Sequence, residues 1–297
     1  MDVERLRLLR NFAEHGTVHA TAEALSLTTS AVSQQLKRLQ REAGVQLLEP
    51  HGRRVRLTEA GRALVARADE VLAALDRATA EMEGFRTTPR GAVRVAIVPS
   101  AAAMLLPGLI AETSEIGVEV IARDIDHSAA RTPELLAEHD VVVIDRDERD
   151  TTTWGPRYNS TFLLREPLDL LLRPDHHLAA NDSIALHELA HCSWISVEIG
   201  RMVDDVMRSL ATISGVQPRI IQRINDFRVV EELVLSGVGI ALLPRYAPTV
   251  RELIRKPVEG INVARRIDAI TRTGTAQRPA IAAVIDILTR VASRSSD

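Results

Sequence analysis

Polar side chains recur at helical spacing between residues 28 and 43, and their types suit contact with nucleic acid. Ser30, Gln34, Lys37 and Arg41 fall at i, i+4, i+7 and i+11, which places them on one helix face. That face offers hydroxyl, amide and cationic groups but no acid, a set that can hydrogen-bond base edges and phosphates in a major groove. An ordinary solvated helix face could have the same composition, so the neighbouring segments must decide.

A basic segment follows this helix. His51 and Gly52 form a predicted turn, after which Arg54 and Arg56 alternate with apolar residues as expected of a strand. With Arg53 they could reach phosphates or the minor groove, although arginines on a solvated edge strand can also simply deter aggregation. The charge distribution favours nucleic acid: residues 1–66 carry 10 Lys/Arg against 7 Asp/Glu, in a chain of net charge −3.

Three short helices are predicted to position these side chains. The first ends at Gly16, the second begins at the N-cap candidate Thr17, and the third runs from Thr28 to the residue before Gly44. Two helices separated by so short a turn are what a helix-turn-helix requires.

Three runs in this segment carry a family resemblance: TTSAVSQQLKRL at 28–39, EAGVQLL at 42–48 and RRVRLTEAG at 53–61. They resemble the winged helix-turn-helix of LysR-type transcriptional regulators. Thr29-Ser30 stands where the family often has Gln-Pro, which bears on the bases read, and Leu48-Glu49-Pro50 stands where it usually has Phe-Glu-Arg, which removes a cation and an aromatic. The DNA-contact candidates are Thr28, Thr29, Ser30, Ser33, Gln34, Lys37, Arg38, Arg41, Arg53, Arg54 and Arg56.

A long helix is predicted to follow, from the N-cap candidate Thr58 to about Phe85, and a hinge is predicted at 87–91. An apolar seam in alternating steps of four and three indicates pairing with a second copy of the helix, whereas packing against the chain's own body is the alternative. The family resemblance favours an antiparallel or crossed pair that places two heads on one operator. The seam residues are Leu64, Ala68, Val71, Leu75, Ala78, Met82 and Phe85.

The remaining chain alternates short β-branched runs with helical ones, the rhythm of parallel α/β structure. Strands are predicted at 93–98, 118–121, 141–144, 168–172, 193–196, 219–222 and 240–244, with helices around 105–112, 133–138, 202–213 and 227–235. A late strand near 262–270 and a final helix at 279–291 have no partners at their end of the sequence. We therefore expect them to return to the first lobe, so that two crossover strands join two discontinuous lobes.

The whole-chain prediction is α/β: an N-terminal winged helix-turn-helix, a long linker helix, and a two-lobed α/β effector domain. The body is similar to the effector domain of the same family, and hence to periplasmic binding proteins, above all in the run VLSGVGIALLP at 234–244. The predicted boundaries are 1–58 for the DNA-binding domain, 59–88 for the linker and 89–297 for the effector domain, with lobe 1 at about 91–160 and 267–297 and lobe 2 at about 161–266.

Ligands of open α/β lobes sit at the carboxyl ends of strands, where helix N-termini present free N–H groups. Polar or small residues at such positions are the effector-contact candidates, although some of them could be helix caps alone. They are Ser100, Ala101, Ser128, Ser196, Asn225 and Phe227.

Catalytic and metal motifs are missing from the sequence: it has no Gly-x-Ser-x-Gly, P-loop, Gly-x-Gly-x-x-Gly or His-Glu-x-x-His. His176, His177, His187 and His191 are interpreted as surface residues, and the single Cys192 as a small buried hydrophobe without a resolving partner. With no signal-like N-terminus and no long apolar run, we expect a folded cytoplasmic chain with no cofactor, no metal and no membrane partner.

The leading hypothesis is a LysR-type regulator that binds double-stranded promoter DNA, a small-molecule effector and further copies of itself as a homodimer or homotetramer. RNA polymerase would be a partner if it activates. The alternatives are a DNA-binding head fused to an α/β catalytic domain acting on a metabolite, and an orphan regulator with a collapsed cleft.

Overall fold

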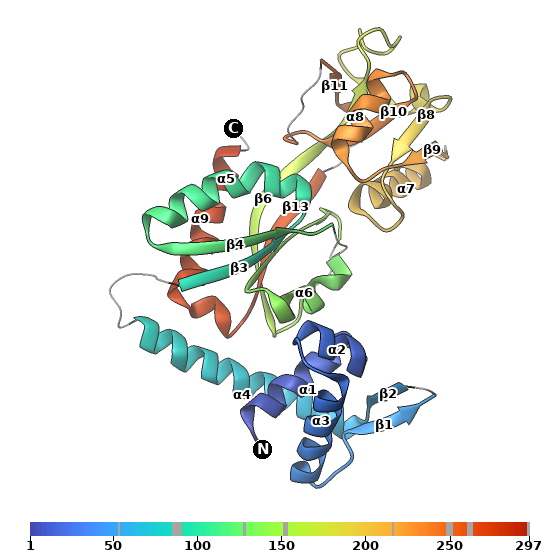
Figure 1. The fold of residues 1–297 in the computed structure, drawn as a ribbon. Coiled ribbons are helices and arrows are strands. Elements are labelled where there is room, and N and C mark those ends of the chain that lie inside the picture. Colours follow the sequence, from blue (N-terminus) through green and yellow to red (C-terminus); the bar gives the residue numbers. More distant parts are fainter. Residues whose placement is uncertain are drawn as a thin grey trace.

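The computed structural model describes residues 1–52, 54–84, 91–126, 129–150, 154–215, 217–247, 252–259 and 264–295. Its parts are a small helical head, one long helix and a two-lobed α/β body (Figure 1). Within the described ranges, no helix is long and apolar enough to cross a membrane. The predicted hinge at 87–91 lies almost wholly outside the described residues.

The head consists of α1 (Val3–His15), α2 (Val18–Ala24), α3 (Thr29–Ala43) and the hairpin of β1 (Leu48–His51) and β2 (Arg54–Leu57). The predicted caps are confirmed: the Thr17 and Thr28 hydroxyls accept hydrogen bonds from the Ala20 and Ala31 N–H groups at 3.1 and 3.2 Å. Gly16 and Gly44 end α1 and α3 with φ of 71° and 69°, a left-handed conformation that favours glycine. The apolar faces of these helices meet in one core containing Leu9, Phe12, Val32, Leu36 and Leu39.

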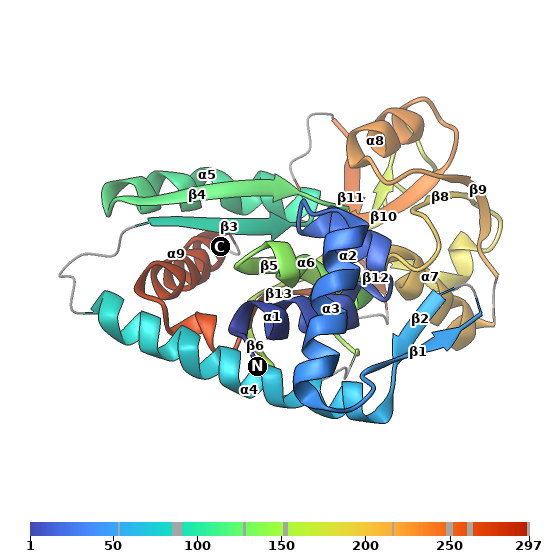
Figure 2. The same cartoon turned by 60° about the horizontal axis from the view of Figure 1, so that its bottom comes forward.

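The long helix α4 (Glu59–Gly84) starts inside the head and leaves it as an extended rod (Figures 1 and 2). The Thr58 hydroxyl accepts a hydrogen bond from the Gly61 N–H at 2.9 Å, as expected of an N-cap. Val65 and Ala68 are buried in the head core, so the first turns of α4 anchor the helix to the head of the same chain.

The first lobe is a sheet in the order β4-β3-β5-β13-β6, in which β3 runs parallel to β4 and β5. Strand β13 is antiparallel to both β5 and β6, which confirms that the late strand and last helix return to this lobe. The elements are β3 (Gly91–Ile97), α5 (Pro99–Glu115), β4 (Val118–Asp124), η1 (Ala129–Arg131), α6 (Thr132–Glu138), β5 (Val141–Asp147), β6 (Tyr158–Leu172), β13 (Ala264–Arg272), η3 (Thr275–Gln277) and α9 (Pro279–Ser295).

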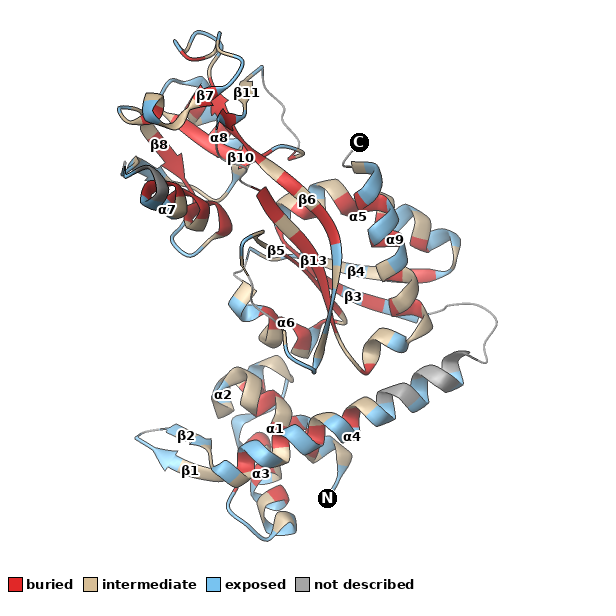
Figure 3. Ribbon diagram, turned by 180° about the vertical axis from the view of Figure 1, so that it is seen from behind, coloured by how far each residue is buried: buried red, intermediate tan, exposed pale blue. Residues whose placement is uncertain are grey.

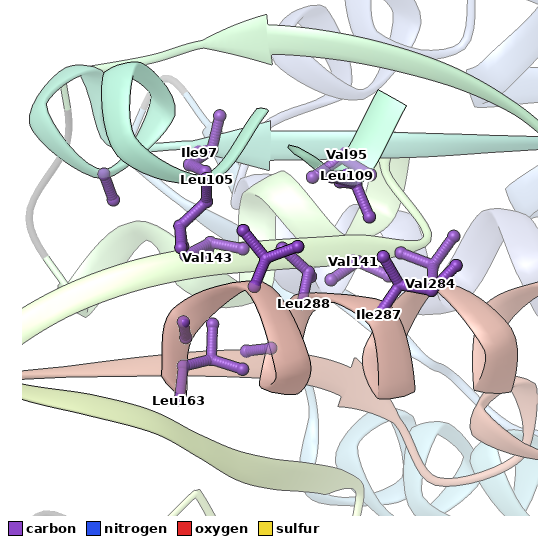
Figure 4. Packing of buried hydrophobic residues seen from close by; sticks show 14 of the residues in the cluster. Val95, Ile97, Leu105, Leu109, Val141, Val143, Leu163, Val284, Ile287 and Leu288 are labelled. Carbon is purple, nitrogen blue, oxygen red and sulfur yellow. The ribbon is translucent and has the colours of Figure 1, made fainter. Parts of the chain in front are cut away.

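The core of this lobe lies between the sheet and the helices α5 and α9 (Figure 4). Leu105 and Leu109 of α5 meet Val284 and Leu288 of α9 over the buried strand residue Val143. Because strands of this sheet are covered on both faces near their middle, they read as continuous apolar runs, which is why β5 was recognisable in the sequence.

The second lobe continues the same sheet through β6 in the order β6-β10-β8-β9, with β11 also on β6. Strand β10 is antiparallel to β6 and parallel to β8. A separate small sheet pairs β12 with β7. The elements are β7 (Ile184–Ala185), η2 (Leu186–Leu189), β8 (Ser193–Ser196), α7 (Met202–Ser214), β9 (Arg219–Arg223), α8 (Phe227–Leu235), β10 (Ile240–Pro244), β11 (Ile254–Lys256) and β12 (Val258–Glu259).

The lobes meet along β6, a 15-residue strand that belongs to both (Figure 3). Residues 158–167 of β6 pair with β13 in the first lobe, and residues 168–172 pair with β10 or β11 in the second. The predicted lobe limits at 160/161 and 266/267 therefore fall inside strands of the first lobe. The sequence prediction began this strand at Leu168 because residues 158–167 mix polar and apolar side chains, whereas 168–172 are mostly apolar.

The head and α4 each form an ion pair with the first lobe of the same chain. The Arg272 guanidinium at the end of β13 lies 3.5 Å from the Glu14 carboxylate at the end of α1. Arg157, just before β6, donates to Asp69 of α4 at 2.8 Å. A Cβ atom at Gly274 would lie 2.7 Å from the Ala73 Cα, so α4 and the chain after β13 approach at a point that only glycine permits.

Candidate functional site

The outward face of α3 carries the predicted DNA-contact residues. Ser33 is half-buried, and the other members of this face, including Gln34 and Thr29, are exposed. The Thr28 and Ser30 hydroxyls are 3.0 Å apart, so Ser30 is held beside the cap of the helix. Lys37, Arg38 and Arg41 are exposed, and none of them forms an ion pair in the described part of the chain. The face is therefore cationic without internal compensation, the state a phosphate backbone selects.

The hairpin beside α3 presents Arg54 and Arg56 in different states. Both are exposed, but Arg56 donates to the Glu49 carboxylate at 2.8 Å, whereas Arg54 has no carboxylate partner among the described residues. Glu49 and Arg56 lie directly opposite each other in the β1–β2 register, a pairing that sequence reasoning missed because a turn at 51–52 would place Glu49 opposite Arg54. Arg53 lies outside the described residues.

The predicted seam of α4 divides into two parts. Leu64 and Ala68 pack into the head of the same chain, whereas Val71, Leu75, Ala78 and Met82 are exposed. Phe85 lies outside the described residues. The exposed stretch is a linear apolar stripe that the described part of this chain leaves uncovered.

A cavity of about 990 Å³ lies between the two lobes. The predicted residues Ser100, Asn225 and Phe227 line it. Ala101 and Ser196 do not: Ala101 is buried in the core of the first lobe, and Ser196 is 2% exposed with a hydroxyl that has no hydrogen-bond partner among the described residues. Ser128 lies outside the described residues.

A fully buried arginine organises the first-lobe wall of this cavity. Arg265 donates to the Ser100 hydroxyl at 2.6 Å, to Asp145 at 3.0 Å and to Glu166 at 2.8 Å. The other oxygen of Glu166 accepts a hydrogen bond from the Tyr246 N–H at 2.6 Å. Sequence reasoning found Ser100 and missed Arg265, because nothing local to β13 indicates that its second residue is buried beside the start of α5.

A direct contact crosses the cavity from one lobe to the other. Arg201 and Asn225 of the second lobe bind the Asp126 carboxylate of the first, at 3.0 and 2.7 Å. The amide oxygen of Asn225 accepts a hydrogen bond from the Glu198 N–H at 3.0 Å, which fixes the orientation of the amide. Asn225 is thus oriented by a backbone group of its own lobe while it donates a hydrogen bond to the other lobe.

The histidines and the cysteine lie away from the cavity. His177, His187 and His191 are exposed, and His176 stacks on His177 with ring centroids 4.4 Å apart; burial and the neighbouring His177 lower the pKa of His176. No three metal-binding side chains converge within the described ranges. Cys192 is half-buried against the core of the second lobe, and burial raises the pKa of its thiol, which makes it a poor nucleophile at neutral pH.

Two family descriptions together match nearly the whole chain. "Bacterial regulatory helix-turn-helix protein, lysR family" matches residues 3–62, and "LysR substrate binding domain" matches residues 86–293. The chain belongs to the LysR family: it is a DNA-binding transcriptional regulator with an effector-binding domain, as its N-terminal runs indicated.

Individual relatives are distant but extend over most of the chain. The chain is 27% identical over 256 residues to a probable hydrogen peroxide-inducible genes activator of Mycobacterium leprae, covering 84% of this chain and 80% of that protein. A full-length OxyR variant from Pseudomonas aeruginosa has a TM-score of 0.67 at 19% identity, covering 97% of this chain and 98% of that one. CbnR in complex with its target DNA has a TM-score of 0.56 at 20% identity, covering 98% and 100%. The last two similarities show a shared fold.

Proposed function

We propose that this chain reads a promoter sequence through α3 and is switched by a small molecule bound between its lobes. The observation that carries the proposal is that one chain holds both an uncompensated cationic helix face and an inter-lobe cavity of about 990 Å³. A small molecule that bridges the lobes would act only through its differential affinity for their closed arrangement.

Strand β13 supplies a physical connection between the two sites. Arg265 at its start contacts Ser100 on the cavity wall, and Arg272 at its end contacts Glu14 of the head. These two residues are seven positions apart, roughly 23 Å at 3.3 Å per residue. Because β13 is hydrogen-bonded to β5 and β6, it would move together with the first-lobe sheet, so a rotation of that sheet on ligand binding would alter the contact with the head. We propose that this strand carries the coupling.

The chain would act as a homodimer or homotetramer in the cytoplasm, with paired α4 helices. The uncovered stripe of Val71, Leu75 and Met82 supports pairing with a second copy. We retain the predicted domain boundaries 1–58, 59–88 and 89–297, with the lobe limits moved to the strand registers. RNA polymerase would be a further partner if the regulator activates.

We further propose that the cavity binds its ligand without chemical change. Its described lining offers aspartates and the serines Ser100 and Ser209 but no histidine, cysteine, lysine or tyrosine, so a serine there has no histidine or lysine beside it to act as its base. A DNA-binding head fused to a catalytic domain would have to rely on these aspartates and serines. Recovery of an unaltered ligand after incubation with the protein supports the regulator; turnover of the ligand contradicts it.

The test of the whole proposal is a map of genomic binding sites followed by footprinting on one site. The native protein should protect a specific sequence, and a ligand of the cavity should change either the affinity or the extent of protection. Coupling of this kind typically changes affinity about 5- to 150-fold. A footprint unaffected by a ligand that demonstrably binds the cavity would leave a DNA-binding protein without a switch.

A further inference from the structure

The inter-lobe cavity is lined by more acidic than basic side chains, a charge that disfavours an anionic ligand. Its lining includes seven aspartates and four arginines: Asp124, Asp126, Asp145, Asp147, Asp150, Asp205 and Asp226, with Arg146, Arg149, Arg201 and Arg228. No other ionisable side chain is in the part of the lining that the structure describes. The cavity therefore has an acidic surplus before any ligand enters.

The four arginines are already occupied by carboxylates. Arg149 pairs with Asp147 at 2.6 Å and Arg228 with Asp226 at 2.9 Å. Arg201 pairs with Asp126 across the lobes. Arg146 pairs at 2.9 Å with the buried carboxylate of Asp268 outside the lining. An anionic ligand would have to displace one of these carboxylates to gain a cationic partner, at the cost of leaving that carboxylate unpaired.

Two of the aspartates retain uncompensated charge. Asp124 ends β4, is exposed to the cavity, and has no side-chain partner in the described part of the chain. Asp145 shares one guanidinium, that of Arg265, with the buried Glu166. Two carboxylates on one arginine leave a net negative charge, and Asp145 is the member of this group that lines the cavity. A positive ligand group is what both positions lack.

The N-terminus of α5, which also borders the cavity, would by itself attract an anion. Here its first-turn hydroxyl, Ser100, accepts a hydrogen bond from Arg265, and Asp145 lies on the same guanidinium. A carboxylate is therefore already bound to the guanidinium that contacts the first turn of α5.

A bare metal cation does not fit the acidic surplus. No group of three histidine, cysteine, aspartate or glutamate side chains in the described residues is placed to hold a metal ion. The carboxylates are dispersed around the wall, between apolar groups that include Val98, Met202, Val203 and Phe227. Dispersed single carboxylates on an apolar wall suit separated ammonium or guanidinium groups on a hydrocarbon body.

We propose that the effector of this regulator is an organic cation that carries one or more ammonium or guanidinium groups on an aliphatic body. This proposal rests on the proposed function, since it assigns a chemical class to the ligand of the same cavity. Asp124 is the recognition carboxylate on the first lobe, and Asp145 receives a second positive group.

The experiment compares probes of equal length and opposite charge on the full chain. Calorimetry at low salt measures 1,5-diaminopentane and agmatine against glutarate, with 1,8-diaminooctane against suberate as the longer pair. We expect binding of the cations, weakened by added salt, and none of the dicarboxylates. Asp124→Asn should weaken the cations about 5- to 10-fold through loss of one charge-assisted contact. Glu119→Gln, an exposed carboxylate at the other end of β4, is the matched control and should leave binding unchanged.

Each contrary result overturns the proposal in a recognisable way. Tighter binding of a dicarboxylate than of its diamine, binding of neither, or equal effects of Asp124→Asn and Glu119→Gln would each remove the cationic class. Failure of the proposed function has a different signature, because a diamine would then bind and leave the promoter footprint unchanged. An anion that changes the footprint would keep the regulator and reject the ligand class.

Discussion

The reading face of the head and the inter-lobe cavity are built from the sequence in opposite ways. The face is presented by one 15-residue helix, and its residues are neighbours at helical spacing. The cavity is lined from segments between residues 98 and 247 on both lobes. A local site is visible in a sequence pattern, whereas a site made of strand ends from two lobes depends on topology and pairing.

The two regions also differ in how their charges are treated. On α3 three cations stand free of any acid in the described residues, ready for a partner outside the chain. In the cavity all four lining arginines are engaged by carboxylates. The cations of the first region are thus available to an external polyanion, whereas those of the second are paired with carboxylates of the same chain.

The largest expected effect comes from removing the arginine on which the cavity wall depends. Arg265→Met removes the cation shared by the buried Glu166 and by Asp145. We therefore expect a loss of about 3–5 kcal/mol in the free energy of unfolding. Urea titration followed by tryptophan fluorescence measures it, since Trp154 and Trp194 are both in the body. Arg290→Met, at an exposed pair with Glu112, is the control and should change little. Equal midpoints for the two variants would show that the buried cluster contributes nothing to stability.

The next effect tests dimerisation through α4, the helix that lies between the two regions. Leu75→Glu places a charge on the exposed stripe of α4, so the protein should become monomeric and operator affinity should fall about a hundredfold or more as bivalent binding is lost. Sedimentation and gel-shift titration measure the two quantities. Ala66→Glu, exposed on another face of the same helix, should preserve both. A Leu75→Glu variant that remains dimeric and binds the operator normally would exclude the stripe as the interface.

Two substitutions in the head distinguish sequence-specific base contacts from sequence-independent phosphate contacts. Gln34→Ala should reduce discrimination between the operator and a variant site by about 1–3 kcal/mol. The reason is that a side-chain amide can donate one hydrogen bond to a base edge and accept another from it. Arg54→Ala should weaken all duplexes alike and lower the slope of log affinity against log salt by about one unit. Gel shifts on matched and mismatched duplexes at several salt concentrations distinguish these patterns. If Gln34→Ala left the specificity ratio unchanged, α3 would not be the reading helix.

How far the sequence predicts each region follows from the same contrast. The caps at Thr17, Thr28 and Thr58 and the two glycine stops could be located because each depends on residues within a turn of it. The Arg265 cluster could not, since its partners lie 99, 120 and 165 positions away in sequence. Ala101 was chosen for its place at a helix N-terminus, but the first turn of α5 directs it to the core. The position of a residue after a strand therefore does not show whether its side chain, in the first turn of the following helix, faces the cavity or the core.

The smallest expected effect probes the contact that joins the two regions. Glu14 of the head is 4% exposed, and burial raises the pKa of its carboxyl, while Arg272, Arg10 and Arg157 lower it and Asp69 raises it further. A pKa raised in the folded state means that the native protein holds this proton more tightly than the unfolded chain does. The resulting stability is complete below the unfolded value of about 4.5 and is lost as the pH rises through the raised value.

Glu14→Gln removes this titration and retains the shape of the side chain. The stability of the wild type relative to Glu14→Gln should therefore decrease as the pH rises above about 4.5, and then become constant once Glu14 is ionised. Thermal unfolding of both proteins across this range measures the difference, in which the titration of all other groups cancels. A decrease ties the head to β13 through a buried carboxyl. A difference that rises with pH would mean that attraction to Arg272 outweighs burial, and a constant one that Glu14 is not buried in solution, as separation of the head from the body would produce.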